Sequence, residues 1–387
     1  LQGNWIYVVA AVSLGLAGIF FVQYGMEKGL LPPGLRVLAA LAFGAGLVGA
    51  GEWLRRKHGD EGATSTVNLP SVFSGAGVVT LFAAVLAARQ LYGLIGPGLA
   101  FAGHLGAAVL AVGLGWLSGP LLVAVGLVGA FVAPMIVGGS SPHMDWLYGY
   151  FALIAGVGLA VDAVRRWAWV SVLALVLGYA GGAMIWAGGG GDIGWCLLML
   201  ALTLMALTLP ELRLIPAQTG PATLPALAMK GKAGWPPFPV RLAFGAEAVS
   251  TLGLFMATMG RPESALFAMA GLAGLAIVLL LWAEKAEGLD DLSLLPSAGL
   301  IAAIAAAPGV WSQLFGQFDL ADLTSRPPET APSGIASILL VMAGLVSAAH
   351  AYRALRPGPW GVAFGLAAVL VAPVSAAVLE LWWQPAR

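Results

Sequence analysis

Two ionisable residues lie inside long apolar stretches of the sequence and are the first candidates for chemistry. Glu247 comes seven residues after the start of the run 240–259, and His104 lies ten residues into the run 94–117. An ionisable side chain inside a membrane is costly unless it is paired or hydrated, so such residues often mark binding sites or proton pathways. We expect Glu247 and His104 to form a proton, cation or polar-ligand site. The alternative for each is a structural hydrogen bond to a neighbouring helix.

Three charged residues near the ends of apolar runs are further candidates. Arg36 and Arg89 are placed where a guanidinium either extends toward lipid headgroups or recognises a phosphate-bearing ligand. Glu52 precedes Arg55 and Arg56 by three and four residues, a spacing that predicts local ion pairs on one helix face. The more specific hypothesis is that Glu52 contributes to a ligand-binding site.

Nothing in the sequence predicts a catalytic residue, a metal site or a cofactor. The pattern Gly44-x-Gly46-x-x-Gly49 matches a dinucleotide fingerprint, but it lies within an apolar run instead of between a strand and a helix. Cys196 is the only cysteine, which excludes an intrachain disulfide and a multi-cysteine metal site. One acidic group in the segment 312–332 could serve an enzyme, although a solvated loop is the simpler reading. Its members are Asp319, Asp322 and Glu329.

The composition is that of a membrane protein. Hydrophobic residues make up 60% of the 387 residues, charged residues only 9%, and the mean hydropathy is +0.92. Apolar runs of about 20 residues recur throughout, each long enough as a helix to cross a ~30 Å hydrocarbon layer. The sequence therefore predicts an all-α, polytopic transmembrane bundle. The net charge of zero gives no electrostatic basis for binding nucleic acid, so we expect membrane lipids, other membrane proteins or a second copy as partners.

We predict thirteen membrane spans. The eleventh is interrupted by Pro296 and Pro308, and the spacing of Gly115 with Gly119 and of Gly178 with Gly182 predicts close helix packing. The thirteen spans cover about 5–24, 35–54, 69–92, 94–117, 120–137, 146–165, 167–187, 193–212, 240–259, 264–283, 292–311, 333–353 and 359–383.

The distribution of positive charge predicts the orientation. With the N-terminus of this segment in the cytoplasm, 12 of the 18 Lys and Arg residues fall on the cytoplasmic side and 6 fall outside. Cytoplasmic loops carry the excess of Lys and Arg in membrane proteins, and inverting the topology would reverse the bias. We therefore expect the N-terminus to be cytoplasmic.

A repeated segment suggests internal duplication. Gly119–Pro134 reads GPLLVAVGLVGAFVAP and Gly358–Pro373 reads GPWGVAFGLAAVLVAP, with nine of 16 positions identical. The triplet LPS at Leu69 and Leu295 supports the match, and so does QL[Y/F]G at Gln90 and Gln313. Spans one to five then recur as nine to thirteen. Eight spans separate each pair, so the copies face the same way, as parallel repeats do. Chance similarity among Ala/Gly/Leu/Val-rich helices is the alternative.

This pattern divides the chain into four segments. Residues 1–140 form the first five-helix repeat, 141–213 a three-helix insert, 214–239 a proline-rich cytoplasmic connection, and 240–387 the second five-helix repeat.

Several motifs in the first half of the chain resemble a known family. They are GMEKGLLPPG at 25–34, GEWLRR at 51–56, LYGLIGP at 91–97 and GLVGAFVAP at 126–134. Together they are similar to the bacterial DUF2339 family of predicted multi-pass membrane proteins, over at least residues 5–190. The resemblance implies a bacterial inner-membrane protein and implies no activity. Members of that family are usually longer, with a soluble N-terminal segment and further spans, so we expect these residues to belong to a longer protein.

Three classes of function fit the sequence. The first is an intramembrane protein that binds or translocates a lipid or small solute, with Glu247 and His104 lining its site. The second is a non-catalytic scaffold or accessory subunit whose Gly/Ala-rich faces pack against other membrane proteins. The third is a membrane enzyme acting on a lipid-linked substrate through the acidic residues of 312–332; we favour a non-enzymatic role.

The predicted topology can be tested with reporter fusions in the full chain. Green fluorescent protein fused after residue 62 or 230 should fluoresce, because both positions are predicted to be cytoplasmic. Alkaline phosphatase fused after residue 140, 190 or 387 should be active, because the predicted thirteen-span topology places all three outside. The opposite pattern would reject the orientation, and a difference between positions 140 and 387 would reject the parallel repeat.

Overall fold

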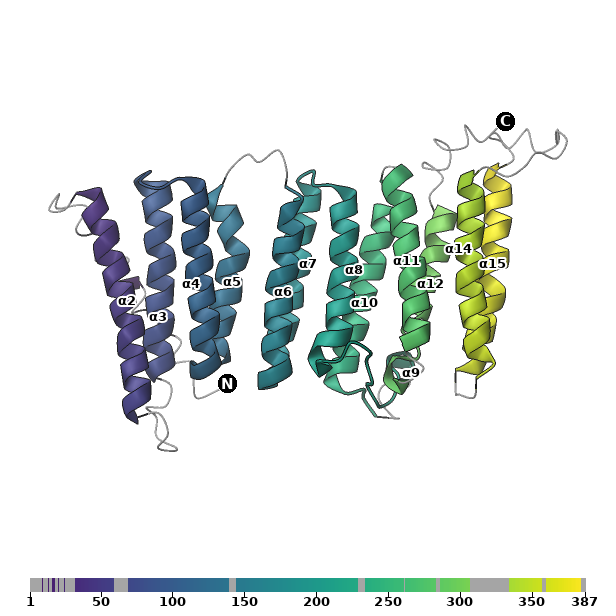
Figure 1. Cartoon of the computed structure of the whole chain (residues 1–387), viewed down its shortest axis with the longest axis horizontal. Helices are drawn as coiled ribbons and strands as arrows, with labels where there is room; N and C mark the ends of the chain where they lie inside the picture. Colours follow the sequence, from purple (N-terminus) through teal and green to yellow (C-terminus); the bar gives the residue numbers. More distant parts are fainter. Residues whose placement is uncertain are drawn as a thin grey trace. The chain divides into compact units, whose positions relative to one another are not determined.

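The computed structural model describes residues 32–58, 69–138, 144–228, 234–260, 262–282, 286–306, 334–356 and 360–383, with six isolated positions between residues 9 and 24. Within these ranges the chain forms helices and turns and no strand (Figure 1). The helices are α2 Pro33–His58, α3 Leu69–Leu86, α4 Pro97–Ser118, α5 Pro120–Val137, α6 Trp146–Arg165, α7 Ala168–Ala187, α8 Asp192–Thr208, α9 Thr223–Ala228, α10 Phe238–Ala257, α11 Pro262–Trp282, α12 Leu294–Ala306, α14 Gly334–Ala354 and α15 Gly361–Trp383.

The all-α membrane architecture is confirmed. Twelve helical segments among the described residues are long and apolar enough to cross a membrane. They correspond to the second to thirteenth predicted spans, with ends that differ by a few residues. The first predicted span, 5–24, lies almost entirely outside the described residues. Helices suit this sequence because lipid offers no hydrogen-bond partners, so each backbone N–H and C=O must be satisfied within its own segment.

The described chain separates into two compact units. Unit 1 comprises residues 1–143 and 164–177, and unit 2 comprises residues 144–163 and 178–387. Unit 1 contains α2 to α5, and unit 2 contains most of α6, the second half of α7 and every later helix. The predicted four-segment division remains a prediction.

In unit 1, α2 and α3 approach each other closely because glycines line their contact. A Cβ at Gly77 would lie 2.6 Å from the carbonyl oxygen of Gly44 and 2.8 Å from the backbone nitrogen of Val48. A Cβ at Gly51 would lie 2.8 Å from the carbonyl oxygen of Pro70. These contacts are between backbones, and only the absence of a side chain permits them.

The connection between α4 and α5 is a tight turn at Gly119. This residue has φ +117°, a conformation that favours glycine, and Pro120 follows at the first position of α5, where its missing N–H costs nothing. Gly115 lies inside α4, where a Cβ would lie 2.6 Å from the backbone nitrogen of Val123. The predicted packing role is therefore right for Gly115 and wrong for Gly119, which is required by the turn.

In unit 2, polar side chains join α8 to α10. The indole Nε1 of Trp195 donates a hydrogen bond to the carbonyl oxygen of Gly253 at 2.9 Å, and Ser250 Oγ donates to the carbonyl oxygen of Met199 at 2.8 Å. Gly182 of α7 lies against Leu198 and Trp195 of α8, and Gly178 lies against Ala155 of α6. The predicted packing role of both glycines is therefore right.

One end of unit 2 is closed by the residues between α8 and α10. We call this the connection end; it contains α9 and the residues 286–293 that precede α12. Pro296 is the third residue of α12, in the first turn, where a proline is tolerated. It therefore does not interrupt the helix as the sequence suggested, and Pro308 lies outside the described residues.

The repeated sequence segments form α5 and α15. Each helix contains an interior proline, Pro134 in α5 and Pro373 in α15. The duplication and its parallel orientation remain predictions.

The glycine contact between α2 and α3 predicts that alanine at position 77 destabilises the protein and that alanine at position 46 does not. Gly77→Ala should lower the free energy of unfolding by about 1–3 kcal/mol, because the new methyl group meets backbone atoms that cannot move aside. Gly46→Ala is the matched control, since nothing lies within 4 Å of a Cβ at that position. Thermal unfolding in detergent should show a lower Tm for the first variant only. Equal Tm values for both would contradict the close backbone contact.

Candidate functional site

The five candidate residues are divided between the two units. Arg36, Glu52, Arg89 and His104 belong to unit 1, and Glu247 belongs to unit 2. Each is described within its own unit.

Glu247 is the most deeply enclosed of the candidates. It lies on α10, about 13 Å along the helix from the first residue, and its side chain is 0% exposed. Its Oε1 accepts a hydrogen bond from Thr251 Oγ1 at 3.3 Å, on the same helix. Its Oε2 has no hydrogen-bond partner among the described residues. An ionised carboxylate at this depth is costly without a further partner, so the second oxygen requires a proton or an external donor.

None of the hydroxyl groups of Tyr179, Ser250 and Thr251 donates to Oε2 of Glu247. Tyr179 OH donates to the carbonyl oxygen of Ala246 at 3.0 Å and lies 2.9 Å from Ser250 Oγ. The hydroxyl proton of Ser250 goes to Met199. Thr251 supplies its proton to the other carboxyl oxygen of Glu247. These hydroxyls place a polar layer beside the carboxyl group while leaving Oε2 without a donor.

His104 has a local hydrogen bond. It is 2% exposed on α4, and its Nδ1 lies 2.9 Å from the carbonyl oxygen of Ala100, one turn earlier. Because a carbonyl only accepts, Nδ1 is the donor in this hydrogen bond. The ring of Phe82 lies 5.8 Å from the imidazole. This hydrogen bond lies within α4. The structural alternative that we expected for His104 was a hydrogen bond to a neighbouring helix, and the bond to Ala100 is not of that kind.

The two arginine candidates lie near helix ends. Arg89 is part of a π-helical turn, Ala87–Leu91, that extends α3. Its Nη1 makes a long contact of 3.5 Å with the carbonyl oxygen of Ile95, and its Nε is buried without a hydrogen-bond partner among the described residues. Arg36 lies in the first turn of α2 and is half-buried.

Glu52 is paired as its spacing predicts. One carboxylate oxygen lies 2.7 Å from Arg55 Nη2 and from Arg56 Nε, and the other accepts a bond from Arg55 Nε at 2.8 Å. Ion pairs at this spacing support the helix end. The local pairing is confirmed, and it accounts for the charge of Glu52 without a ligand.

A group of buried charges at the connection end of unit 2 was not among the candidates. Asp290 and Arg353 form an ion pair with a distance of 2.6 Å between Oδ1 and Nη2, and their side chains are 9% and 12% exposed. The pair joins the turn before α12 to the last turn of α14. The partners are 63 residues apart in sequence, so no local spacing revealed them.

Asp291 fixes a different part of the same end. It is 0% exposed, and its Oδ2 accepts a hydrogen bond at 2.5 Å from the backbone nitrogen of Leu224, in the first turn of α9. A carboxylate at this position satisfies a backbone N–H that has no partner within the helix. The adjacent acids Asp290 and Asp291 thus hold α14 and α9 to one turn. The sequence feature that could have indicated this site is the pair of successive aspartates, Asp290 and Asp291, directly before an apolar run.

His350 lies one turn before Arg353 on α14 and is also 0% exposed. Its Nδ1 lies 3.0 Å from the carbonyl oxygen of Val346, and its Nε2 lies 3.5 Å from Ser297 Oγ. Ser297 donates its proton to the carbonyl oxygen of Ser293 at 2.8 Å. These contacts are those of a structural histidine that packs α14 against α12.

Asp319, Asp322 and Glu329, the acidic group considered for an enzyme, lie outside the described residues. Within the described ranges, no group of three or more His, Cys, Asp or Glu side chains is placed to hold a metal ion.

The buried ion pair predicts a large stability difference between two otherwise similar changes. Arg353→Ala should destabilise the protein by about 3–5 kcal/mol, because the carboxylate of Asp290 would remain buried without its partner. Glu52→Gln, which breaks a more exposed pair, should cost only about 0–1 kcal/mol. Thermal unfolding of both variants in the same detergent measures the difference. Small and equal losses would show that the Asp290–Arg353 pair is not desolvated.

Comparison with known proteins gives one match. The family model described as "Predicted membrane protein (DUF2339)" matches residues 2–386, so the chain belongs to the DUF2339 family. The match extends the sequence resemblance from the first half to nearly the whole chain. The description names a membrane location and no activity. No curated protein and no solved structure matches the chain.

Proposed function

We propose that this DUF2339 protein binds or translocates a small solute within the membrane and that Glu247 is its binding group. In the absence of solute the carboxyl group of Glu247 holds a proton. A cationic or hydrogen-bond-donating group of the solute takes the place of that proton when it binds.

One observation supports this role above the others. Glu247 is completely buried in a span-length helix, and one of its carboxyl oxygens has no partner among the described residues. Asp291 also has a buried oxygen, Oδ1, without a partner, but its Oδ2 accepts a hydrogen bond from the backbone of α9, whereas the side-chain hydrogen bond of Glu247 comes from Thr251 on its own helix. An unsatisfied buried acceptor costs about 1–3 kcal/mol, and at Glu247 no link to another element among the described residues offsets that cost. The presence of a carboxyl group at position 247 is consistent with a binding group that exchanges a proton for a solute.

The surroundings of Glu247 also favour exchange over a fixed structural bond. The hydroxyls of Tyr179, Ser250 and Thr251 give the site polar groups from two helices of unit 2. Tyr179 and Ser250 donate to backbone carbonyls and Thr251 donates to Oε1, so none of the three donates to Oε2 of Glu247. Ionisable residues inside membrane-spanning helices commonly mark substrate, ion or proton pathways.

The location proposed for this activity is the bacterial cytoplasmic membrane, with the N-terminus of this segment in the cytoplasm. The excess of Lys and Arg on one side of the predicted topology supports that orientation. Lipids are the proposed partners of the outward apolar faces.

A scaffold role is the second candidate, and uncovered glycines favour it. Among the described residues, no atom of a neighbouring element lies within 4 Å of the position of a Cβ at Gly344 of α14 or Gly365 of α15. Small residues on outward faces are typical of helix association in membranes. In this role the faces of α14 and α15 would contact another membrane protein or a second copy.

Infrared spectroscopy of the complete protein in lipid nanodiscs tests the proton at Glu247. The unaltered protein should show a C=O stretching band of a neutral carboxyl group in apolar surroundings. Glu247→Gln should remove the band, because the C=O group of an amide absorbs at a lower frequency than that of a neutral carboxyl group. Glu52→Gln should leave it unchanged. A band that persists in Glu247→Gln, or no band in the unaltered protein, would reject Glu247 as the proton-binding group.

A further inference from the structure

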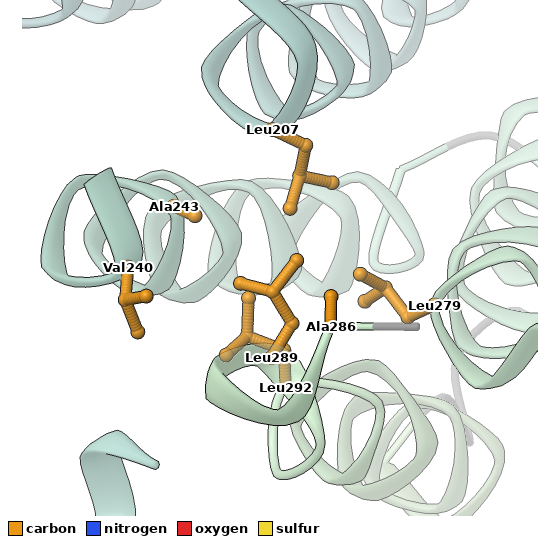
Figure 2. Close-up of a cluster of buried hydrophobic side chains, with 7 residues drawn as sticks. All are labelled: Leu207, Val240, Ala243, Leu279, Ala286, Leu289 and Leu292. Carbon is orange, nitrogen blue, oxygen red and sulfur yellow. The ribbon is translucent and has the colours of Figure 1, made fainter. Parts of the chain in front are cut away.

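An apolar cluster lies next to Glu247 along α10, toward the connection end of unit 2. We call its seven residues the apolar cluster; all are 0% exposed, and they come from α8, α10, α11 and the residues 286–292. Figure 2 shows the side chains of Leu207, Leu279 and Leu289 pointing into the same space. The full set is Leu207, Val240, Ala243, Leu279, Ala286, Leu289 and Leu292.

The register of α10 places this cluster directly next to Glu247. Ala243 precedes Glu247 by four residues, one helical turn or about 6 Å along the axis. Val240 lies nearly one turn further toward the connection end. Ser250, on the other side of Glu247, forms the hydrogen bonds with Tyr179 and Met199. The carboxyl group therefore lies between a layer with hydroxyl groups and a layer of hydrocarbon.

Three residues of the apolar cluster come from a segment that is not a continuous helix. Ala286, Leu289 and Leu292 belong to residues 286–292, which form a short 3₁₀ turn at Glu287–Leu289 followed by further turns. We call residues 286–292 the gate segment. Its backbone is short and irregular, so it can move without breaking the hydrogen bonds of a long helix.

Polar contacts hold the gate segment in place. Gly288 N donates to the carbonyl oxygen of Gln218 at 3.1 Å, and Gln218 Nε2 donates to the carbonyl oxygen of Leu207 at 3.0 Å. Asp290 pairs with Arg353, and Asp291 accepts the hydrogen bond from α9. The ion pair and these hydrogen bonds fix the position of a segment whose inner side is aliphatic.

We infer that the gate segment controls access to Glu247 from the connection end, with the Asp290–Arg353 ion pair as the latch that keeps it closed. The inference rests on the proposed function of Glu247. The apolar cluster excludes water, because narrow passages lined by hydrophobic side chains do not fill with water. Breaking the latch frees the segment that supplies three of the seven side chains and lets water reach the carboxyl group.

Cysteine labelling measures this access directly. Glu247→Cys is made in a Cys196→Ala background, which removes the only native cysteine. A membrane-impermeant, charged thiol reagent is added from the connection end to sealed vesicles of defined sidedness. Without further change, the thiol introduced at position 247 should react slowly. Arg353→Gln should raise the rate by about tenfold or more, because losing a latch of only ~1.4 kcal/mol shifts a closed–open equilibrium tenfold.

Further variants separate gating from loss of structure. Leu289→Ser should raise the labelling rate through the gate segment itself, with the latch intact. The exchange of Asp290→Arg with Arg353→Asp should return the rate toward that of the unaltered latch. Leu197→Ser is the matched control, because Leu197 lies on α8 with 53% of its surface exposed and is outside the apolar cluster. Its rate should equal that of the background.

The outcomes distinguish this inference from the proposed function. Labelling needs no carboxyl group at position 247, so it reports on the gate whether or not Glu247 binds a proton. Rapid labelling of the thiol at position 247 from the connection end with the latch intact would overturn the inference. An unchanged rate in both Leu289→Ser and Arg353→Gln, with both proteins eluting as the background does on size exclusion, would also overturn it.

Discussion

The interior of the bilayer supplies no hydrogen bonds, and this constraint determines most of what the structure shows. Backbone groups are satisfied within helices, and side-chain polar groups are used where a partner is within reach. Hydroxyl and indole groups in unit 2 donate to backbone carbonyls of the adjacent helix, as Trp195 does to Gly253. The ion pairs Glu52–Arg55 and Asp290–Arg353 lie near helix ends. Two buried carboxyl oxygens, Oε2 of Glu247 and Oδ1 of Asp291, have no partner among the described residues, and only that of Glu247 belongs to a residue inside a continuous helix.

Close packing between helices accounts for their association. Lipid tails are as apolar as leucine, so helices do not associate merely to hide apolar side chains. Close contact between backbones provides the attraction, and Gly44 with Gly77 in unit 1 shows how small the contacting residues must be. Unit 2 adds interhelical hydrogen bonds and an ion pair to this mechanism. The result is a unit in which polar contacts are concentrated at certain depths and hydrocarbon fills the others.

The sequence predicts the helices better than it predicts the site. Twelve predicted spans are present because runs of about 20 apolar residues have few alternatives in lipid. The pairing of Glu52 with Arg55 and Arg56 is predictable because helix geometry fixes neighbours three and four residues apart. The Asp290–Arg353 pair is not predictable from the sequence, because it depends on the packing of α14 against a turn 63 residues earlier. For the same reason, the sequence marks Glu247 as buried but does not reveal which of its oxygens has a donor. Glycine spacing alone does not separate Gly119, needed for its backbone conformation, from Gly115, needed for contact.

The π-helical turn at the end of α3 has a consequence for how this helix can vary. Tyr92 N donates to the carbonyl oxygen of Ala87, five residues earlier, so the turn holds one residue more than an α-helical turn does. A single-residue insertion or deletion at this place changes the π turn and leaves the hydrogen-bonded turns before it in register. The length of α3 can thus differ by one residue among relatives while its glycine contact with α2 is preserved.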